Sequence, residues 1–210
     1  MNLTNYFWCF PSALTPRFCD EVIKYALEKE ETQALTGKFG RGRNVKKKPL
    51  NKDEVRDLKY LRNSNSTWLN DRWIYKEIQP YVALANKEAG WNFNWIRSEA
   101  CQFTKYKLNQ YYDWHRDSFP EPSSEGTIRK LSMTCQLTNG SEYSGGELVF
   151  DFRDYDPPQR DESKHLRKAK QILPKGSIIV FPSFVWHRVK PVTQGVRYSL
   201  VSWHVGNPFK

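Results

Sequence analysis

The stretch YYDWHRD, residues 111–117, places a histidine and an aspartate two positions apart, His115 and Asp117. In an extended strand, residues i and i+2 point to the same face, so this imidazole and this carboxylate would project side by side. In that position they can act as two ligands of a small octahedral metal ion. Because an H-x-D triplet often arises by chance, the rest of the chain must decide whether a metal binds here.

A third ligand is offered by His187, which ends the stretch FPSFVWH at residues 181–187. It follows an apolar strand and the turn-like pair Pro182-Ser183, where a ligand at the rim of a barrel would lie. Two histidines and one carboxylate on one face of an ion, with the other positions open, suit a non-haem Fe(II) oxygenase. The other histidines are expected outside this site, since His165 stands in a charged loop and His204 should face the other side of its strand.

The chain of 210 residues is long enough for one domain with a full core, and we expect a single domain over residues 1–210. Its helical support is expected at about 1–95 and its catalytic core at about 96–210. No apolar run approaches the roughly 18 residues of a membrane span. The first residues carry neither a basic leader nor a long apolar stretch, which argues against a signal peptide.

The four cysteines show no C-x-x-C spacing and lie mostly in apolar strand or helix patterns. They are therefore expected to be reduced and buried, as in an intracellular protein. The formal net charge of +10 favours acidic partners, nucleic acid included, but it does not define a function.

Two helices are predicted in the first half of the chain. Thr15-Pro16 has the residue types of an N-cap and a first helical position, for a helix that continues to about residue 31. Apolar residues at helical spacing predict a second helix over 71–89, with Gly90 as the residue that closes it. Pro80 should kink or split this second helix. Both helices are expected to cover one face of a sheet.

From residue 91 onward the hydrophobic period changes to two, which predicts strands separated by turns such as Gly145-Gly146. Many short strands after helices predict a mostly antiparallel jelly-roll, a cupin-like double-stranded β-helix with a helical buttress. The chain is therefore expected to be mostly β within the α+β class. The predicted strands cover residues 97–106, 131–137, 147–152, 177–181 and 196–203.

Two charged stretches are predicted to be loops. The basic stretch KFGRGRNVKKK at 38–48 has no periodicity, and it is either a solvated mobile loop or a basic flap over a substrate groove. Residues 154–170 are charged and contain prolines, so they are interpreted as an inserted loop.

Alternation also predicts polar faces on two of the strands. These faces either contact solvent, as in an ordinary sheet, or line the inside of a barrel around a polar ligand. The neighbouring His115 and Asp117 favour the second interpretation, because a metal and an anionic co-ligand need such a lining. The residues concerned are Gln102, Thr104 and Tyr106 in one strand, and Ser132, Thr134 and Gln136 in the next.

Arg197 lies ten residues after His187, on a predicted strand with apolar surroundings. A buried arginine without an anionic partner costs on the order of several kcal/mol, so an anion is expected beside it. A structural Asp or Glu would serve. The far end of a bound dicarboxylate would serve equally well, because a guanidinium binds a carboxylate in a forked geometry.

Several stretches of the second half match one known family: YYDWHRD (111–117), RKLS (129–132), YSGGEL (143–148), the run from Gly176-Ser177 to Phe181-Pro182-Ser183, HRVKPVT (187–193) and GVRYSL (195–200). With them, the segment from about residue 102 to 206 resembles the 2-oxoglutarate/Fe(II) dioxygenases. The resemblance is strongest to the prolyl 4-hydroxylase-like branch, which includes bacterial and viral PKHD-type hydroxylases. The N-terminal half matches more loosely, through residues 14–16, 19–20, 62–64 and Trp68.

The resemblance implies Fe(II) held by His115, Asp117 and His187, with 2-oxoglutarate as co-substrate and ascorbate as a candidate reductant. Arg197 would bind the distal carboxylate of 2-oxoglutarate, and Tyr106 would donate its hydroxyl to it. The cofactor pocket would further be lined by Thr134, Gln136, Leu148 and Trp203.

Two departures count against nucleic acid as the substrate. The nucleic-acid demethylase branch of the same superfamily typically has a second arginine six residues after the first, and an Asn-x-Tyr pattern before it. This chain has Trp203 and Thr104-Lys105-Tyr106 at those places. Arg62 and Ser64 match the family without an assigned role.

The implied activity is hydroxylation of a prolyl residue in a peptide or protein, with dioxygen consumed and succinate and CO2 released. The peptide would lie between the two charged loops, with Trp114 or Trp186 near the target ring. Three alternatives stay open: a nucleic-acid hydroxylase or demethylase, a small-molecule hydroxylase, and a metal-free, cupin-like binding module whose basic face recruits an acidic partner. The implied location is the cytoplasm of a bacterium or of a virus-infected cell.

Overall fold

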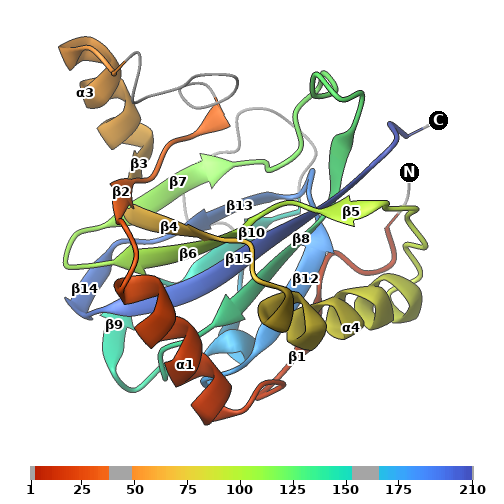
Figure 1. The fold of residues 1–210 in the computed structure, drawn as a ribbon, viewed down its shortest axis with the longest axis horizontal. Helices are drawn as coiled ribbons and strands as arrows, with labels where there is room; N and C mark the ends of the chain where they lie inside the picture. Colours follow the sequence, from red (N-terminus) through yellow and green to blue (C-terminus); the bar gives the residue numbers. More distant parts are fainter. Residues whose placement is uncertain (1–2, 38–48, 153–165, 210) are drawn as a thin grey trace.

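The fold is a pair of antiparallel β-sheets with helices on the outer face of the larger one, seen in a computed structural model that describes residues 3–37, 49–152 and 166–209 (Figure 1). The larger sheet has the strand order β1-β12-β8-β15-β6-β4-β2, with β5 paired to β15, and the smaller has the order β11-β10-β13-β7-β3. A two-stranded sheet joins β14 to β9. This is the mostly β, double-stranded β-helix architecture that the sequence predicts.

The larger sheet consists of β1 (Trp8–Phe10), β2 (Thr32–Gln33), β4 (Asn65–Leu69), β5 (Arg97–Ser98), β6 (Cys101–Tyr106), β8 (Ile128–Gln136), β12 (Ile178–Pro182) and β15 (Arg197–Gly206). The smaller consists of β3 (Arg62–Asn63), β7 (Tyr111–His115), β10 (Leu148–Asp151), β11 (Leu166–Lys168) and β13 (Trp186–Val189). The third sheet consists of β9 (Tyr143–Gly145) and β14 (Val192–Gly195).

The predicted strands are present, with two corrections. The strand predicted at 97–106 is interrupted: β5 and β6 both pair with β15, and residues 99–100 between them belong to neither strand. The described end of the loop predicted at 154–170 has regular structure instead, because β11 pairs with β10 and a 3-10 turn, η1, follows at Lys170–Ile172. The remainder of that loop, including His165, and the basic stretch 38–48 lie outside the described residues.

Helix α1 (Pro16–Leu27) begins as predicted, with the Thr15 Oγ1 accepting a hydrogen bond from the Phe18 amide at 3.2 Å. It ends earlier than the predicted residue 31, because the chain turns away to form β2, which pairs with β4. Its buried side chains, which include Val22, pack in the cluster formed with the larger sheet.

Pro80 was predicted to kink or split helix α4 (Arg72–Glu88). The helix continues through Pro80, so the split is wrong. Apolar residues on both sides of the proline, Ile78 and Val82, are fully buried, and this packing holds the two halves in one helix while Pro80 itself is exposed. Gly90, with φ of +74°, closes the helix as predicted.

Helix α3 (Lys52–Leu61) is not among the sequence predictions. Its start is fixed by a capping box in which Asn51 Oδ1 accepts from the Glu54 amide while Glu54 Oε2 accepts from the Asn51 amide, both at 2.9 Å. Among the described residues, no helix is both long and apolar enough to cross a membrane. The four cysteines are free, and all but Cys9 are buried.

The two faces of β8 have opposite chemistry. Leu131, Met133 and Cys135 pack outward in the cluster that contains α1 and α4. Ser132 and Gln136 point to the other side, between the two sheets, and are also almost completely buried. The polar face therefore lines the interior of the barrel, as the second interpretation of the sequence predicts.

Candidate active site

The structure brings together the three predicted metal ligands. His115 ends β7 and lies opposite His187 of β13 in the strand ladder, and Asp117 follows two residues later. His115 Nε2 lies 3.8 Å from Asp117 Oδ1, and His187 Nε2 lies 3.5 Å from Asp117 Oδ2. One ligand atom from each residue lies within 4.8 Å of the other two, so the three can surround a single ion.

Both histidines are held by their second ring nitrogen. His115 Nδ1 lies 2.7 Å from the Asp113 carbonyl oxygen, and His187 Nδ1 lies 2.9 Å from the Val185 carbonyl oxygen. A carbonyl oxygen only accepts hydrogen bonds, so each Nδ1 carries the proton. In the neutral form of each imidazole, Nε2 then has the free lone pair, facing Asp117, that a metal ligand requires.

The protonation states also suit a cation. Burial, together with the neighbouring His187, lowers the pKa of His115 well below its usual value. Burial would raise the pKa of Asp117, but the two imidazoles, Arg129 and a hydrogen bond from Ser132 outweigh it and lower that pKa to about 2. Near neutral pH the cluster therefore consists of a neutral His115 and an anionic carboxylate, which match the ligand forms that divalent metals bind.

A small cavity, called here the inner cavity, adjoins the cluster and has Arg197 in its wall. Arg197 is only 2% exposed, and among the described residues no carboxylate lies within ion-pair distance of it and its Nε has no partner. Among the described residues, the Arg197 side chain makes one hydrogen bond, a long one to Ser199 Oγ at 3.4 Å. The guanidinium thus has the free donors and the burial that a bound carboxylate would satisfy.

Gly146 makes room for the Arg197 side chain. A Cβ built on Gly146 would lie 3.1 Å from Arg197 Cδ and 3.0 Å from Val192 Cγ2, and the φ of this glycine is +63°. The second glycine of the stretch YSGGEL, Gly146, is therefore required by its backbone conformation and by the close approach of the arginine.

Of the other predicted pocket residues, Tyr106, Thr134, Leu148 and Trp203 line the inner cavity. Gln136 does not line it, although it lies on the same face of β8. Its amide nitrogen donates instead to the Thr138 carbonyl and the Tyr143 hydroxyl, at 2.9 and 3.0 Å.

Arg62 has a place in the site that the sequence did not reveal. Its guanidinium lies 4.3 Å from the ring centroid of Tyr112, and that ring stacks on His115 with centroids 3.5 Å apart and an angle of 9°. Arg62 also donates to Gln102 Oε1 and to Ser64 Oγ, at 2.8 and 2.9 Å. Arg62 and Ser64 had no role assigned from the sequence. In the structure Ser64 holds Arg62, and Arg62 packs on the Tyr112 ring that stacks against His115.

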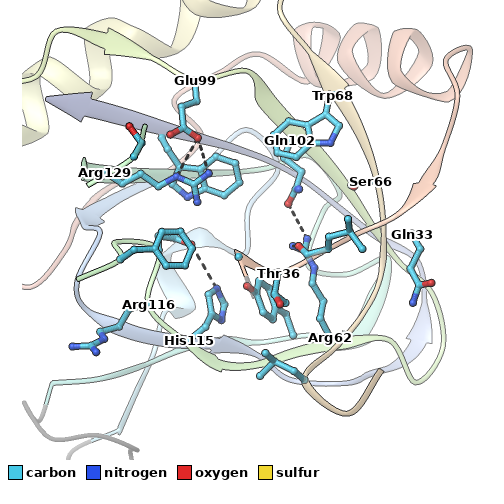
Figure 2. A pocket seen from close by; sticks show the side chains of 18 of the residues that line it. Gln33, Thr36, Arg62, Ser66, Trp68, Glu99, Gln102, His115, Arg116 and Arg129 are labelled. Atoms are coloured by element: carbon cyan, nitrogen blue, oxygen red, sulfur yellow. Dashed lines mark hydrogen bonds and ion pairs between the residues drawn. The ribbon is translucent and has the colours of Figure 1, made fainter. Parts of the chain in front are cut away.

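A second, open cavity of about 1070 Å³, called here the outer groove, begins at His115 and Asp117 (Figure 2). Trp203 lies between the inner cavity and the outer groove and lines both. Arg129 stacks on Trp203 at 3.8 Å and pairs with Glu99 at 2.6 Å. Figure 2 shows the Arg129–Glu99 ion pair and the Arg62–Gln102 hydrogen bond on the groove walls.

Trp114 and Trp186, expected near the substrate, line neither cavity. Trp114 precedes His115 in the same strand and therefore points to the opposite face, where its ring contacts Arg188. Trp186 contacts Arg116 in the same way. The exposed tryptophan of the outer groove is instead Trp68, which is 51% exposed and lies 6.1 Å from Trp203 between ring centroids.

The second half of the chain matches the 2OG-Fe(II) oxygenase superfamily over residues 101–205, and the chain belongs to this family. Among its relatives, a PKHD-type hydroxylase of Synechococcus sp. (strain CC9902) is 34% identical over 108 residues, which cover 51% of this chain and 41% of the relative. Another, from Prochlorococcus marinus (strain MIT 9515), is 28% identical over 87% of this chain and 71% of its own length. The chain thus spans less than half the length of relatives such as the first.

Two solved structures share the fold. The viral collagen prolyl hydroxylase of Paramecium Bursaria Chlorella virus-1 has a TM-score of 0.64 and 19% identity, covering 97% of both chains. A Pseudomonas putida prolyl-4-hydroxylase has a TM-score of 0.64 and 20% identity, covering 96% of this chain and 93% of its own. At this level of identity the likeness establishes the fold and not the substrate.

The residues present fit the two groups for which the family is named. Two imidazole lone pairs and one carboxylate suit Fe(II) with further positions open. The buried Arg197, with unpaired donors in the wall of the adjoining cavity, suits a dicarboxylate such as 2-oxoglutarate.

Proposed function

We propose that the chain is a 2-oxoglutarate- and Fe(II)-dependent dioxygenase that hydroxylates prolyl residues in a peptide or protein. The observation that carries the proposal is the convergence of His115, Asp117 and His187 beside a cavity with an unpaired, buried Arg197. Neither half would suffice, because the cofactor chemistry requires the metal and the diacid together.

In this proposal the histidine Nε2 atoms and the Asp117 carboxylate hold Fe(II). Arg197 would bind the distal carboxylate of 2-oxoglutarate and leave the keto acid end of the molecule for the metal. Tyr106, which pairs with Arg197 across β6 and β15, lies in the same cavity wall. When both are bound, 2-oxoglutarate and dioxygen are converted to succinate and CO2, and one oxygen atom enters a C–H bond of the substrate. The buried walls exclude water from that step.

The outer groove supports a peptide as the substrate. It is open and continuous with the metal ligands, and its walls include the half-exposed Trp68 and the largely buried Trp203 beside polar groups such as Gln102. Aromatic faces pack well on apolar rings, so a prolyl side chain suits these walls. The names of the two structural neighbours, and a peptide complex of a Trichoplax adhaerens prolyl hydroxylase with TM-score 0.54, agree with this choice.

The test is to incubate the protein with Fe(II), 2-oxoglutarate, ascorbate and a panel of proline-rich peptides and to measure peptide mass and succinate. We expect a gain of one oxygen atom on a prolyl residue, and no gain with the His187→Ala variant. Oxygen transfer to a methylated oligonucleotide or a free amino acid, with none to any prolyl peptide, would replace the prolyl assignment and leave the cofactor chemistry intact. No succinate formation with any substrate would favour the binding-module alternative.

A further inference from the structure

Two buried serines connect the Asp117 carboxylate to the turn between β12 and β13. Ser132 Oγ, in β8, donates to Asp117 Oδ2 at 2.7 Å, and it lies 2.9 Å from Ser183 Oγ in the turn. Both serines are completely buried. Ser132 belongs to the larger sheet and Ser183 to the turn, so their contact fixes the carboxylate relative to two separate parts of the chain.

The chemistry sets the direction of both hydrogen bonds. An ionised carboxylate only accepts hydrogen bonds, so Asp117 Oδ2 takes the single hydroxyl proton of Ser132. Ser183 must then donate its own proton to Ser132 Oγ. A donor that is itself an acceptor is polarised, so the second bond strengthens the first.

The same turn also holds the backbone of the ligand. The amides of Asp117 and Ser118 both donate to the Ser183 carbonyl at 2.9 Å, and the Ser183 amide donates to the Lys130 carbonyl at 3.0 Å. Ser183 is thus bound to Asp117 through its main chain and, by way of Ser132, through its side chain.

We propose that Ser132 and Ser183 are positioning residues that fix the rotation of the Asp117 carboxylate for metal binding. With Oδ2 held by Ser132, the carboxylate is fixed in the rotation that places Oδ2 3.5 Å from His187 Nε2 and Oδ1 3.8 Å from His115 Nε2. In this rotation the carboxylate would turn toward the point where the two imidazoles converge, which is where it would help to hold the ion. This inference rests on the proposed Fe(II) site.

A purely structural role would be served by any buried hydroxyl, and Ser202 provides the comparison. Ser202 is as fully buried as Ser132. It pairs with Met133 in the strand ladder and therefore lies on the outer face of the larger sheet, opposite to the face that carries Ser132 and Asp117. Replacing Ser202 therefore removes a buried hydroxyl without touching the metal ligands.

The experiment titrates Co(II), a redox-stable stand-in for Fe(II), into the metal-free protein and records the affinity and the visible absorption bands of the bound ion. Partners of metal ligands typically contribute roughly 10- to 100-fold in affinity. Ser132→Ala should weaken Co(II) binding about 10-fold or more and shift the bands, since the carboxylate is free to rotate. Ser183→Ala should weaken it about threefold, and the double variant should match Ser132→Ala because the two hydroxyls act in series.

Ser202→Ala should keep both the affinity and the bands of the unaltered protein. Equal affinity and equal bands for Ser132→Ala and Ser202→Ala would overturn the proposal. If Ser132→Ala does not fold by circular dichroism, Ser183→Ala decides in its place, and an unchanged affinity and spectrum would overturn it too. Absence of Co(II) binding by the unaltered protein would refute the metal site itself, which is a separate result.

Discussion

The inner cavity and the outer groove meet at His115 and Asp117, but they are built in different ways. The inner cavity is small, its polar groups are buried, and its Arg197 has unsatisfied hydrogen-bonding capacity. The outer groove is large and open, and its charged pair Glu99–Arg129 is already satisfied. The difference indicates that the inner cavity is pre-formed for one small anion, while the outer groove admits longer and more varied molecules.

Four substitutions test this contrast, and a fifth prediction concerns a histidine outside both cavities. The largest effect is expected from Asp117→Asn. This variant keeps the size of the side chain but removes its negative charge, so the ion loses its anionic ligand. We expect metal affinity to fall by more than the roughly 100-fold upper range for partners of ligands, with loss of turnover. Equilibrium titration with Mn(II) measures the affinity, and near-normal binding would exclude Asp117 as a ligand.

Arg197→Ala should abolish most 2-oxoglutarate binding while leaving Mn(II) binding intact. Truncating one partner of a buried charge pair costs about 2–5 kcal/mol, or roughly 30-fold and upward in affinity. Calorimetric titration of 2-oxoglutarate into the Mn(II)-loaded protein provides the measurement. Arg197→Lys is the matched control and should recover part of the loss, because it restores the charge but not the forked geometry.

The free energy of unfolding should depend on pH through His204, a buried residue of β15 that lines neither cavity. Burial lowers the pKa of His204 from 6.5 to about 4, so the folded protein keeps this imidazole neutral where the unfolded chain would protonate it. Its stabilising contribution is present above pH 6.5 and is lost as the pH falls toward 4, by about 3 kcal/mol. Urea unfolding across this range should show the loss.

The matched variant His204→Gln keeps a polar group near Ser98, whose Oγ lies 2.9 Å from His204 Nδ1, but it cannot titrate. Its unfolding free energy should depend less steeply on pH between 6.5 and 4. The same slope in both proteins would assign the acid sensitivity to other groups.

Gly146→Ala should perturb the inner cavity through the Arg197 side chain. The added Cβ would approach Arg197 Cδ to 3.1 Å, and a positive φ costs a non-glycine residue about 1–2 kcal/mol. We expect 2-oxoglutarate affinity to fall about tenfold, on the order of 1.4 kcal/mol. Gly126→Ala is the control, since Gly126 also has a positive φ but no atom within 4 Å of the new Cβ. Equal affinity in the two variants would mean that Arg197 does not need this space.

The smallest effect is expected from Trp68→Ala, because Trp68 lines the outer groove and not the inner cavity. Loss of one aromatic contact is worth about 0.5–1.5 kcal/mol, so KM for a peptide substrate should rise roughly 2- to 10-fold. The KM for 2-oxoglutarate should not change. Trp73→Ala, which removes a 37% exposed tryptophan of α4 outside the groove, is the control. A rise in both KM values would show that Trp68 supports the inner cavity instead.

The parts of the site that sequence could predict are those fixed by short-range geometry. The i, i+2 spacing of His115 and Asp117 places them on one face of an extended segment, and alternation in β8 separates Ser132 from its apolar neighbours. The same rule places Trp114 on the face opposite His115, so the expectation that it would touch the substrate conflicted with strand parity. The capping box at Asn51 was equally visible, and α3 could have been predicted from it.

Other features depend on contacts between distant residues. Arg62 reaches Tyr112 because the two-residue strand β3 pairs with β7, and so short a strand has no recognisable period. Pro80 remains in a continuous helix because tertiary packing of Ile78 and Val82 outweighs its local preference. Gln136 has the predicted parity, yet its partners Thr138 and Tyr143 draw its amide away from the inner cavity.

The most direct test is a crystal structure of the protein with Mn(II) and 2-oxoglutarate. We predict one ion bound by the Nε2 atoms of His115 and His187 and by the Asp117 carboxylate, with the distal carboxylate of 2-oxoglutarate paired to the Arg197 guanidinium. An ion held elsewhere, or a diacid bound without contact to Arg197, would contradict the assignment of the inner cavity.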